Sequence, residues 1–201
     1  WSMDGDYVAK IEGFFEMELH SFFAQLDLAP PELVVNLGCA EGYYAVGAAT
    51  RWPLAKIRAV DINPVALQET LELAKLNAVE DRLELALDYW DFNKEAKAKQ
   101  LWIVDIEGDE RTVLDASVFP ELLEATIIVE LHPFVEGGGL GPSDVAERFG
   151  ETHEVQVVSS SGRNPNISET LASVHDDLKW AAMSEGRRTL MEWAILEPRA
   201  N

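Results

Sequence analysis

The segment VVNLGCAEGYYAVGAA, which runs from Val34 to Ala49, decides the fold class of this chain. Its apolar first residues predict a buried strand, and the small apolar residues at its end predict a helix. Gly38 and Gly42 lie in the turn between them, where the lack of a Cβ lets the backbone approach a ligand. A second predicted strand, Lys56 to Val60, is followed by Asp61, whose carboxylate can accept hydrogen bonds from both hydroxyls of a ribose. The pattern predicts a site for an adenosine-containing ligand.

The turn itself discriminates among adenosine cofactors. It reads Gly38-Cys39-Ala40-Glu41-Gly42 and lacks the G-x-G-x-x-G spacing that holds a pyrophosphate. Glu41 also puts a negative charge where a pyrophosphate would lie. S-adenosylmethionine carries no phosphate and has a positive sulfonium, so the acidic turn favours that cofactor. Two alternatives stay open, which are a nicotinamide-dependent oxidoreductase and a protein that binds the cofactor without turnover.

Predicted strands and helices alternate along most of the chain. Further strands are expected at 82–87, 101–106, 126–131, 153–159 and 190–196. A helix at 4–26 covers the sheet or, as an alternative, forms a lid over the substrate. Two more helices are expected, one after the cap Asn63 and first-turn proline Pro64, and one at 166–183 that opens with a capping-box pattern at Asn166. Alternation of this kind is typical of parallel strands joined by right-handed crossovers. We therefore predict an α/β fold: a Rossmann-like, doubly wound, mostly parallel seven-stranded sheet with helices on both faces and an added N-terminal helix.

The glycine turn resembles motif I of class I methyltransferases, and its spacing is most similar to that of the FkbM-type group. The stretch Asp105-Ile106-Glu107-Gly108-Asp109-Glu110 resembles the D-x-E-G-x-E stretch of that group. The resemblance covers residues 13–133 and implies an S-adenosylmethionine-dependent methyltransferase with a small-molecule acceptor and oxygen as the acceptor atom. One position departs from the family. Asn36 stands where the family usually has Asp, and its amide cannot pair with a charged ammonium group.

The resemblance also implies roles for individual residues. Gly38 and its neighbours would hold the methionine part, Asp61 the ribose and Ile62 the adenine. Asp88 and Tyr89 would meet the adenine amino group or ring, although Tyr89 is equally well interpreted as a packed surface aromatic. The predicted cofactor-binding residues are Asn36, Gly38, Cys39, Gly42, Asp61, Ile62, Asp88, Tyr89 and Asp105.

Titratable side chains follow two predicted strands, Asp105 and Glu107 after one and Glu130 and His132 after the next. Residues two apart on an extended chain point the same way, and two close carboxylates raise one pKa enough to make a general base. We predict Glu107 and His132 as catalytic residues, because imidazole titrates near neutrality. The alternatives are a helix start in solvent for Glu107 and Glu110 and a strand-end cap for His132. Asp105, Glu107 and His132 would also suit Mg²⁺ or Mn²⁺, but the spacing does not demand a metal and none is assigned.

Composition limits the partners and the compartment. The formal net charge of −20 disfavours nucleic acid, whose affinity for proteins comes largely from neutralised phosphates. No apolar run approaches the length needed to span a bilayer, and no secretory signal is evident, so no membrane partner is expected. Cys39 is the only cysteine, which fits the cytoplasm. We expect one methyltransferase domain over 1–201, with a helical segment at 1–28, a cofactor-binding core at 32–133 and a C-terminal part at 134–201 that shapes the acceptor site.

Overall fold

The computed structural model describes residues 6–88, 98–135, 137, 139–187 and 189–200. Its centre is a seven-stranded sheet in the order β3-β2-β1-β4-β5-β7-β6. All neighbouring strands pair in parallel except β7, which is antiparallel to both β5 and β6. The strands are β1 Leu33–Leu37, β2 Lys56–Val60, β3 Leu83–Ala86, β4 Gln100–Val104, β5 Thr126–Leu131, β6 His153–Ser159 and β7 Glu192–Pro198. The predicted fold class is confirmed.

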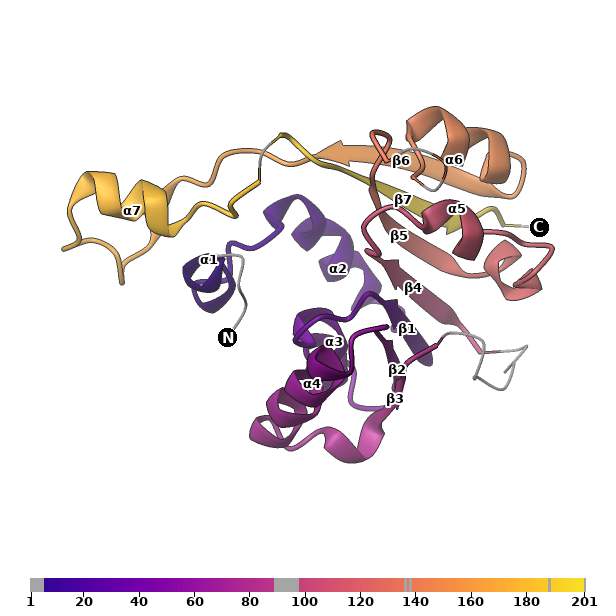
Figure 1. The fold of residues 1–201 in the computed structure, drawn as a ribbon, viewed down its shortest axis with the longest axis horizontal. Helices are drawn as coiled ribbons and strands as arrows, with labels where there is room; N and C mark the ends of the chain where they lie inside the picture. The colour runs from indigo at the N-terminus through magenta and orange to yellow at the C-terminus, as the bar shows by residue number, and fades with distance from the viewer. Residues whose placement is uncertain (1–5, 89–97, 136, 138, 188, 201) are drawn as a thin grey trace.

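Helices lie on both faces of the sheet (Figure 1). They are α1 Tyr7–Ile11, α2 His20–Leu26, α3 Tyr43–Arg51, α4 Pro64–Leu76, α5 Glu110–Val113, α6 Pro142–Phe149 and α7 Asp176–Ala182, with short 3-10 turns at Met17–Leu19, Glu80–Arg82, Pro120–Leu123 and Pro165–Ile167. Side chains alternate between two cores along β1. Val34 belongs to the core that includes residues of α2 and α3, whereas Val35 and Leu37 belong to the core that includes residues of α5 and α6.

The carboxyl ends of β1 and β4 form the switch point of the sheet. β2 and β3 continue from β1 to one side, and β5, β7 and β6 continue from β4 to the other. Ligands of open α/β sheets bind in the crevice at such a point. Gly38 follows β1 there, and Asp105 follows β4, with its backbone N–H donating to the Leu37 carbonyl at 3.0 Å. The expected site residues are therefore placed at the edge where the fold presents a binding crevice.

Two predicted helices are wrong in extent. The helix expected at 4–26 is broken after α1, because Gly13 and Glu16 adopt positive φ values of 71° and 46° that a continuous helix does not allow. The helix expected at 166–183 is reduced to α7, and its proposed capping residue Asn166 instead lies within the 3-10 turn Pro165–Ile167. By contrast, the cap at Asn63-Pro64 is confirmed, since Asn63 Oδ1 accepts from the Val65 N–H at 3.0 Å.

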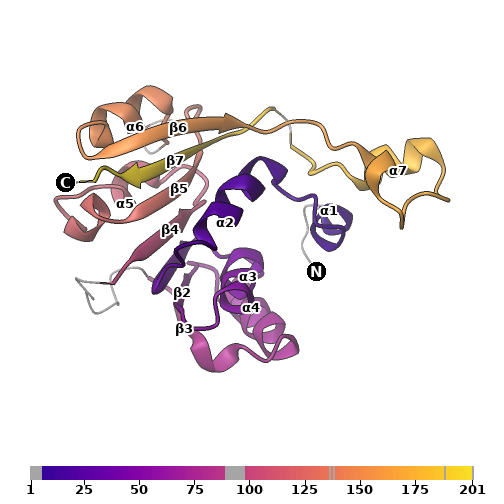
Figure 2. The ribbon, with the colours of Figure 1, turned by 180° about the vertical axis from the view of Figure 1, so that it is seen from behind.

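Residues 160–187, here called the arm, extend away from the sheet between β6 and β7 (Figures 1 and 2). The base of the arm is closed by the Ser160 N–H, which donates to the Met191 carbonyl at 2.7 Å. At the far end, α7 contacts α1. The arm and the N-terminal helix are thus in contact. Within the described ranges, no helix combines the length and apolar character needed to cross a membrane.

Candidate functional site

A cavity of about 410 Å³ lies at the switch point of the sheet. Five predicted cofactor-binding residues line it, together with one predicted catalytic residue: Gly38, Cys39, Asp61, Ile62, Asp105 and Glu107. Asn36, Gly42, Asp88 and His132 are not among its lining residues. Tyr89 lies outside the residues that the structure describes. The structure thus gathers residues from three chain segments, after β1, β2 and β4, around one hollow.

Asp61 joins two of these segments. Its Oδ2 accepts from the Ala40 N–H at 3.0 Å, and its Oδ1 accepts from the Asn63 N–H at 2.8 Å. A carboxylate has about four lone-pair positions, so two remain for a ligand after these bonds. The side chain is therefore held in one orientation while keeping capacity to accept from ribose hydroxyls.

The two glycines of the turn are required by packing as well as by ligand approach. A Cβ at Gly38, which has φ +76°, would lie 1.6 Å from the Asp105 carbonyl oxygen. A Cβ at Gly42, with φ +94°, would lie 2.9–3.0 Å from atoms of Thr70 in α4. Such distances are shorter than any real contact, and positive φ disfavours side chains in any case. The glycines let β1 and β4 meet closely and let α4 pack on the turn.

Cys39 and Asn36 are both buried, but in different places. The Cys39 thiol faces Thr70, with an Sγ–Oγ1 distance of 3.6 Å, and burial raises its pKa to about 12. It is therefore a thiol and not a thiolate nucleophile at neutral pH. The Asn36 side chain lies within the sheet, where Nδ2 is 3.4 Å from the Ile103 carbonyl and Oδ1 has no hydrogen-bond partner among the described residues.

His132 lies at the centre of a group of carboxylates next to the cavity. Its ring is 1 % exposed, and Nδ1 lies 2.7 Å from Oε1 of Glu110. The other nitrogen, Nε2, faces carboxylate oxygens of Glu130, Glu107 and Asp105 at 3.4, 3.5 and 3.9 Å. The predicted catalytic residues Glu107 and His132 are thus brought together. Glu110 is fully buried, so it is not a helix start in solvent, whereas the Glu107 side chain is 84 % exposed.

This concentration of charge shifts two pKa values. Burial opposes charging of His132, but its hydrogen bonds to Glu110 and Glu130 outweigh burial and raise its pKa to about 10. Burial and the charge of Glu130 raise the pKa of Asp105 well above its ordinary value. Both shifts favour protons held at this group of residues at neutral pH. The expectation that His132 titrates near neutrality is therefore wrong in this structure.

The N-terminal segment, residues 6–26, closes one side of the cavity through residues that the sequence analysis did not assign to the site. Asp6, Lys10, Phe15 and Glu16 line it. Lys10 bonds to Glu41 of the glycine turn, and the Glu16 carboxyl accepts from the Tyr44 hydroxyl. Burial raises the pKa of Glu16 well above its ordinary value. Apart from the local ion pair between Lys10 and Asp6, their partners are remote in sequence, so no local motif marks these residues.

The arm is tied to the same segment by buried ion pairs. Arg187 bonds to Glu130 at the end of β5 and to Glu16 at 2.5 Å, and Glu185 accepts from the Glu16 N–H at 3.0 Å. Arg163 pairs with both Glu18 and Glu185. The arm, the N-terminal segment and β5 are therefore connected directly beside the cavity.

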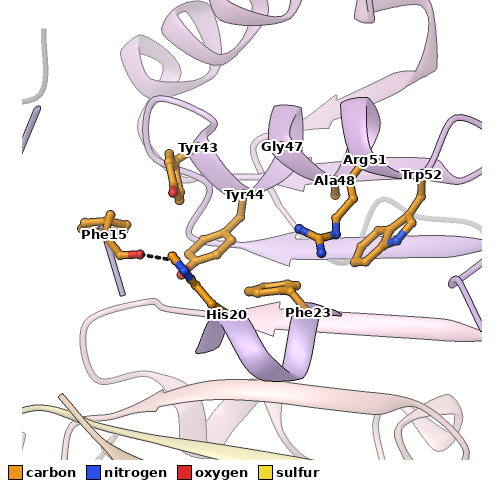
Figure 3. A pocket seen from close by; sticks show the side chains of 9 residues that line it. All are labelled: Phe15, His20, Phe23, Tyr43, Tyr44, Gly47, Ala48, Arg51 and Trp52. Carbon is orange, nitrogen blue, oxygen red and sulfur yellow. Dashed lines mark hydrogen bonds between the residues drawn. The ribbon is translucent and has the colours of Figure 1, made fainter. Parts of the chain in front are cut away.

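A second hollow, of about 480 Å³, lies on the other side of three aromatic residues, Phe15, Tyr43 and Tyr44, which line both cavities. Figure 3 shows Phe15, His20 and Phe23 facing the side chains of α3 across it. The rings pack on one another, with Phe23 and Tyr44 stacked at a centroid distance of 5.7 Å. This hollow is lined by aromatic packing and lacks the acidic groups of the first one.

The fold is that of class I S-adenosylmethionine-dependent methyltransferases. It is similar to that of the O-methyltransferase TomG from Streptomyces achromogenes in complex with S-adenosylmethionine, with a TM-score of 0.58, 10 % identity and coverage of 98 % of this chain and 91 % of that one. It is also similar to a protein from Clostridium thermocellum described as an rRNA methylase, with a TM-score of 0.59, 14 % identity and coverage of 90 % and 96 %.

Sequence relatives exist at higher identity. The ribosomal protein L11 methyltransferase of Shigella sonnei (strain Ss046) is 41 % identical over 138 residues, which are 69 % of this chain and 42 % of that protein. The protein of the same name from Enterobacter sp. (strain 638) is 32 % identical over 117 residues, which are 56 % and 33 %. This chain spans less than half the length of these relatives. Models of protein families give no match, so the resemblance to the FkbM-type group stays a prediction.

These comparisons overturn the expected partners. A small-molecule acceptor and the exclusion of nucleic acid were expected, but the curated sequence relatives are named ribosomal protein L11 methyltransferases. The expectation failed because it rested on net charge and on a family resemblance. Net charge reports the average surface, whereas the acceptor is chosen by local shape and charge around the site.

Proposed function

We propose that this chain is an S-adenosylmethionine-dependent methyltransferase whose acceptor is a protein. The observation that carries the proposal is the convergence of Gly38, Asp61 and Asp105 on one cavity at the switch point of a sheet with a reversed β7. Crevices at this point are where open α/β folds bind nucleoside ligands. The acidic glycine turn favours a sulfonium over a pyrophosphate.

The cofactor roles proposed from the resemblance fit the cavity. Asp61 would accept from the ribose hydroxyls, and the turn at Gly38 and Cys39 would hold the methionine part. Ile62 is 88 % exposed and lines the cavity, so an adenine ring would cover an apolar side chain that otherwise faces water. Asp88 is not among the lining residues, so its contact with the adenine amino group stays a prediction from the resemblance. Asn36 is buried away from the lining, which leaves the amino group of the cofactor to Glu16 or Glu41 at the cavity wall.

The acceptor is inferred from the L11 methyltransferase relatives. A chain with a net charge of −20 attracts a basic protein surface and selects against acidic ones. We place the acceptor between the cavity and residues 134–201, whose arm is fixed beside it by Arg187. Oxygen was favoured over nitrogen as the acceptor atom, and that preference stays a prediction.

When bound, the cofactor supplies an activated methyl group, so the chain has to align the acceptor and remove its proton. Glu107 is the proposed proton acceptor, because its carboxylate is exposed and lines the cavity. His132 is buried behind it and contacts Glu107 and Asp105, so it orients the carboxylates. Glu107 would take up the proton of the acceptor, while Asp61 and the turn at Gly38 would hold the cofactor that supplies the methyl group.

Calorimetric titration with S-adenosylmethionine, S-adenosylhomocysteine and NADH, in the presence of EDTA, tests the cofactor. We expect binding of the first two, lost in Asp61→Ala, and no binding of NADH. Glu124→Gln, an exposed substitution outside the site, is the matched control. Binding of NADH alone would favour the oxidoreductase alternative and contradict the proposal.

Transfer of a labelled methyl group tests the acceptor. Ribosomal protein L11, total ribosomal protein and ribosomal RNA are offered separately. Label in protein is expected, and fragmentation of the labelled peptide identifies the acceptor atom. Label in RNA alone would overturn the protein acceptor. Tight cofactor binding without transfer to any of them would support the alternative of a binding protein without turnover.

A further inference from the structure

We propose that Asp105, Glu107 and His132 hold a divalent metal ion of the Mn²⁺ type at the edge of the cavity. One donor atom from each side chain lies within 4.8 Å of the other two. Bonds of about 2.0–2.2 Å to a metal put adjacent donors about 3 Å apart and opposite donors about 4 Å apart. The three side chains therefore need only a small contraction to bind one ion.

His132 is already oriented as a metal ligand. Its Nδ1 lies 2.7 Å from Glu110, which is fully buried and also accepts from the Gly108 N–H at 2.9 Å. A histidine that binds a metal usually donates its second ring N–H to a carboxylate in this way. Nε2 then points at the carboxylates of Glu130, Glu107 and Asp105, at 3.4, 3.5 and 3.9 Å. A 1 % exposed imidazole thus directs one nitrogen at three carboxylates, none of them closer than 3.4 Å.

Asp105 gives an independent indication. Its Oδ1 is a buried oxygen atom with no hydrogen-bond partner among the described residues. A buried oxygen without a hydrogen-bond partner is unfavourable. This same oxygen is the one that faces His132 Nε2 at 3.9 Å. A cation between them would satisfy both atoms at once.

The ion pairs around this group of residues leave three side chains as candidate metal ligands: Asp105, Glu107 and His132. Glu130 also faces His132, but Arg187 already bonds to its carboxylate. Among the described residues, Asp105 and Glu107 have no cationic partner other than His132. Two carboxylate oxygens and one imidazole nitrogen, with positions left for water, suit Mn²⁺ or Mg²⁺ better than a thiolate-seeking metal.

The metal would lie between the cavity and β5, where it can hold the oxygen or nitrogen of an acceptor and favour loss of its proton. That role rests on the proposed methyltransferase function, but the metal site itself does not. Both Asp105 and Glu107 line the cavity, so an ion bound to them is accessible from it.

Titration of the whole chain with Mn²⁺ without cofactor, followed by electron paramagnetic resonance of the free ion, tests the site. We expect one ion per chain, with affinity reduced about tenfold or more in Asp105→Asn and Glu107→Gln. Glu107→Gln is the decisive variant, since an exposed side chain can be changed without loss of folding. Glu124→Gln removes the same charge at an exposed position and should leave the affinity unchanged.

Absence of Mn²⁺ binding at millimolar concentration would overturn the inference, and so would equal affinity in Glu107→Gln and Glu124→Gln. The methyltransferase proposal and the metal-site proposal can be contradicted independently of each other. Cofactor binding in EDTA without Mn²⁺ binding would leave the methyltransferase proposal standing and remove the metal. Mn²⁺ binding without cofactor binding would support the metal site and contradict the methyltransferase proposal.

Discussion

The guanidinium of Arg163 contacts the carboxylate of Glu18 at 2.7 Å, across 145 residues of sequence. Both side chains are nearly inaccessible, at 3 % and 6 % exposed, and Glu185 shares the same guanidinium at 2.6 Å. The contact fixes the arm against the N-terminal segment that lines the proposed cofactor cavity. It links the part of the chain that we expect to meet the acceptor with the part that covers the cofactor.

Arg163→Ala is expected to lower the free energy of unfolding by about 3–5 kcal/mol, because it leaves the buried Glu18 without its guanidinium partner and Glu185 with Arg187 alone. Urea denaturation measures the change. Arg51→Ala, which breaks an exposed pair with Asp27, should change stability little. Equal effects of the two substitutions would show that the contact between arm and N-terminal segment is not maintained in solution.

Gly38→Ala is expected to destabilise the chain by about 3 kcal/mol or more, or to prevent folding, since the added Cβ meets the Asp105 carbonyl and φ is positive. Gly47→Ala in α3 is the matched control. Its Cβ meets nothing within 4 Å, so alanine should stabilise the helix by about 0.5–1 kcal/mol. Thermal unfolding of both variants gives the comparison, and a Gly38→Ala protein as stable as the parent would contradict the packing at the switch point.

The buried His153 is expected to make the folded chain less stable in acid. Burial lowers its pKa, and its Nε2 lies 3.0 Å from the Ala125 carbonyl. The unfolded chain then binds a proton that the folded chain resists, so stability falls as the pH drops below about 6.5 through the lowered pKa. In His153→Gln this contribution is absent, and stability should change less between pH 7 and pH 5. Parallel curves for the two proteins, measured by urea denaturation, would refute the prediction.

Cys39 should be unreactive in the folded chain. Burial raises its pKa to about 12, so almost no thiolate exists at pH 8. Ellman's reagent is expected to modify the thiol only after denaturation, when the one cysteine of the chain reacts fully. Rapid modification under native conditions would mean that the turn opens far more often than this packing allows.

The sequence by itself determined the positions of the strands along the chain and the position of the glycine turn. These features are local, because apolar runs specify buried strands and a cap such as Asn63-Pro64 acts within a few residues. The meeting of Gly38 with Asp61 could also be predicted, since carboxyl ends of parallel strands share one edge.

Only the tertiary structure decided which charged side chains meet. Glu110 is buried on His132, and Glu16 bonds to Arg187, although neither pair has a spacing that marks it. The helix expected at 166–183 is shortened to α7, and long-range packing is again the cause. Periodicity predicts a helix where an apolar face can be buried, but Trp180 of α7 stays 48 % exposed because the arm extends away from the core. Long-range packing, which no local pattern encodes, therefore determined which residues line the cavity and which residues surround its acidic groups.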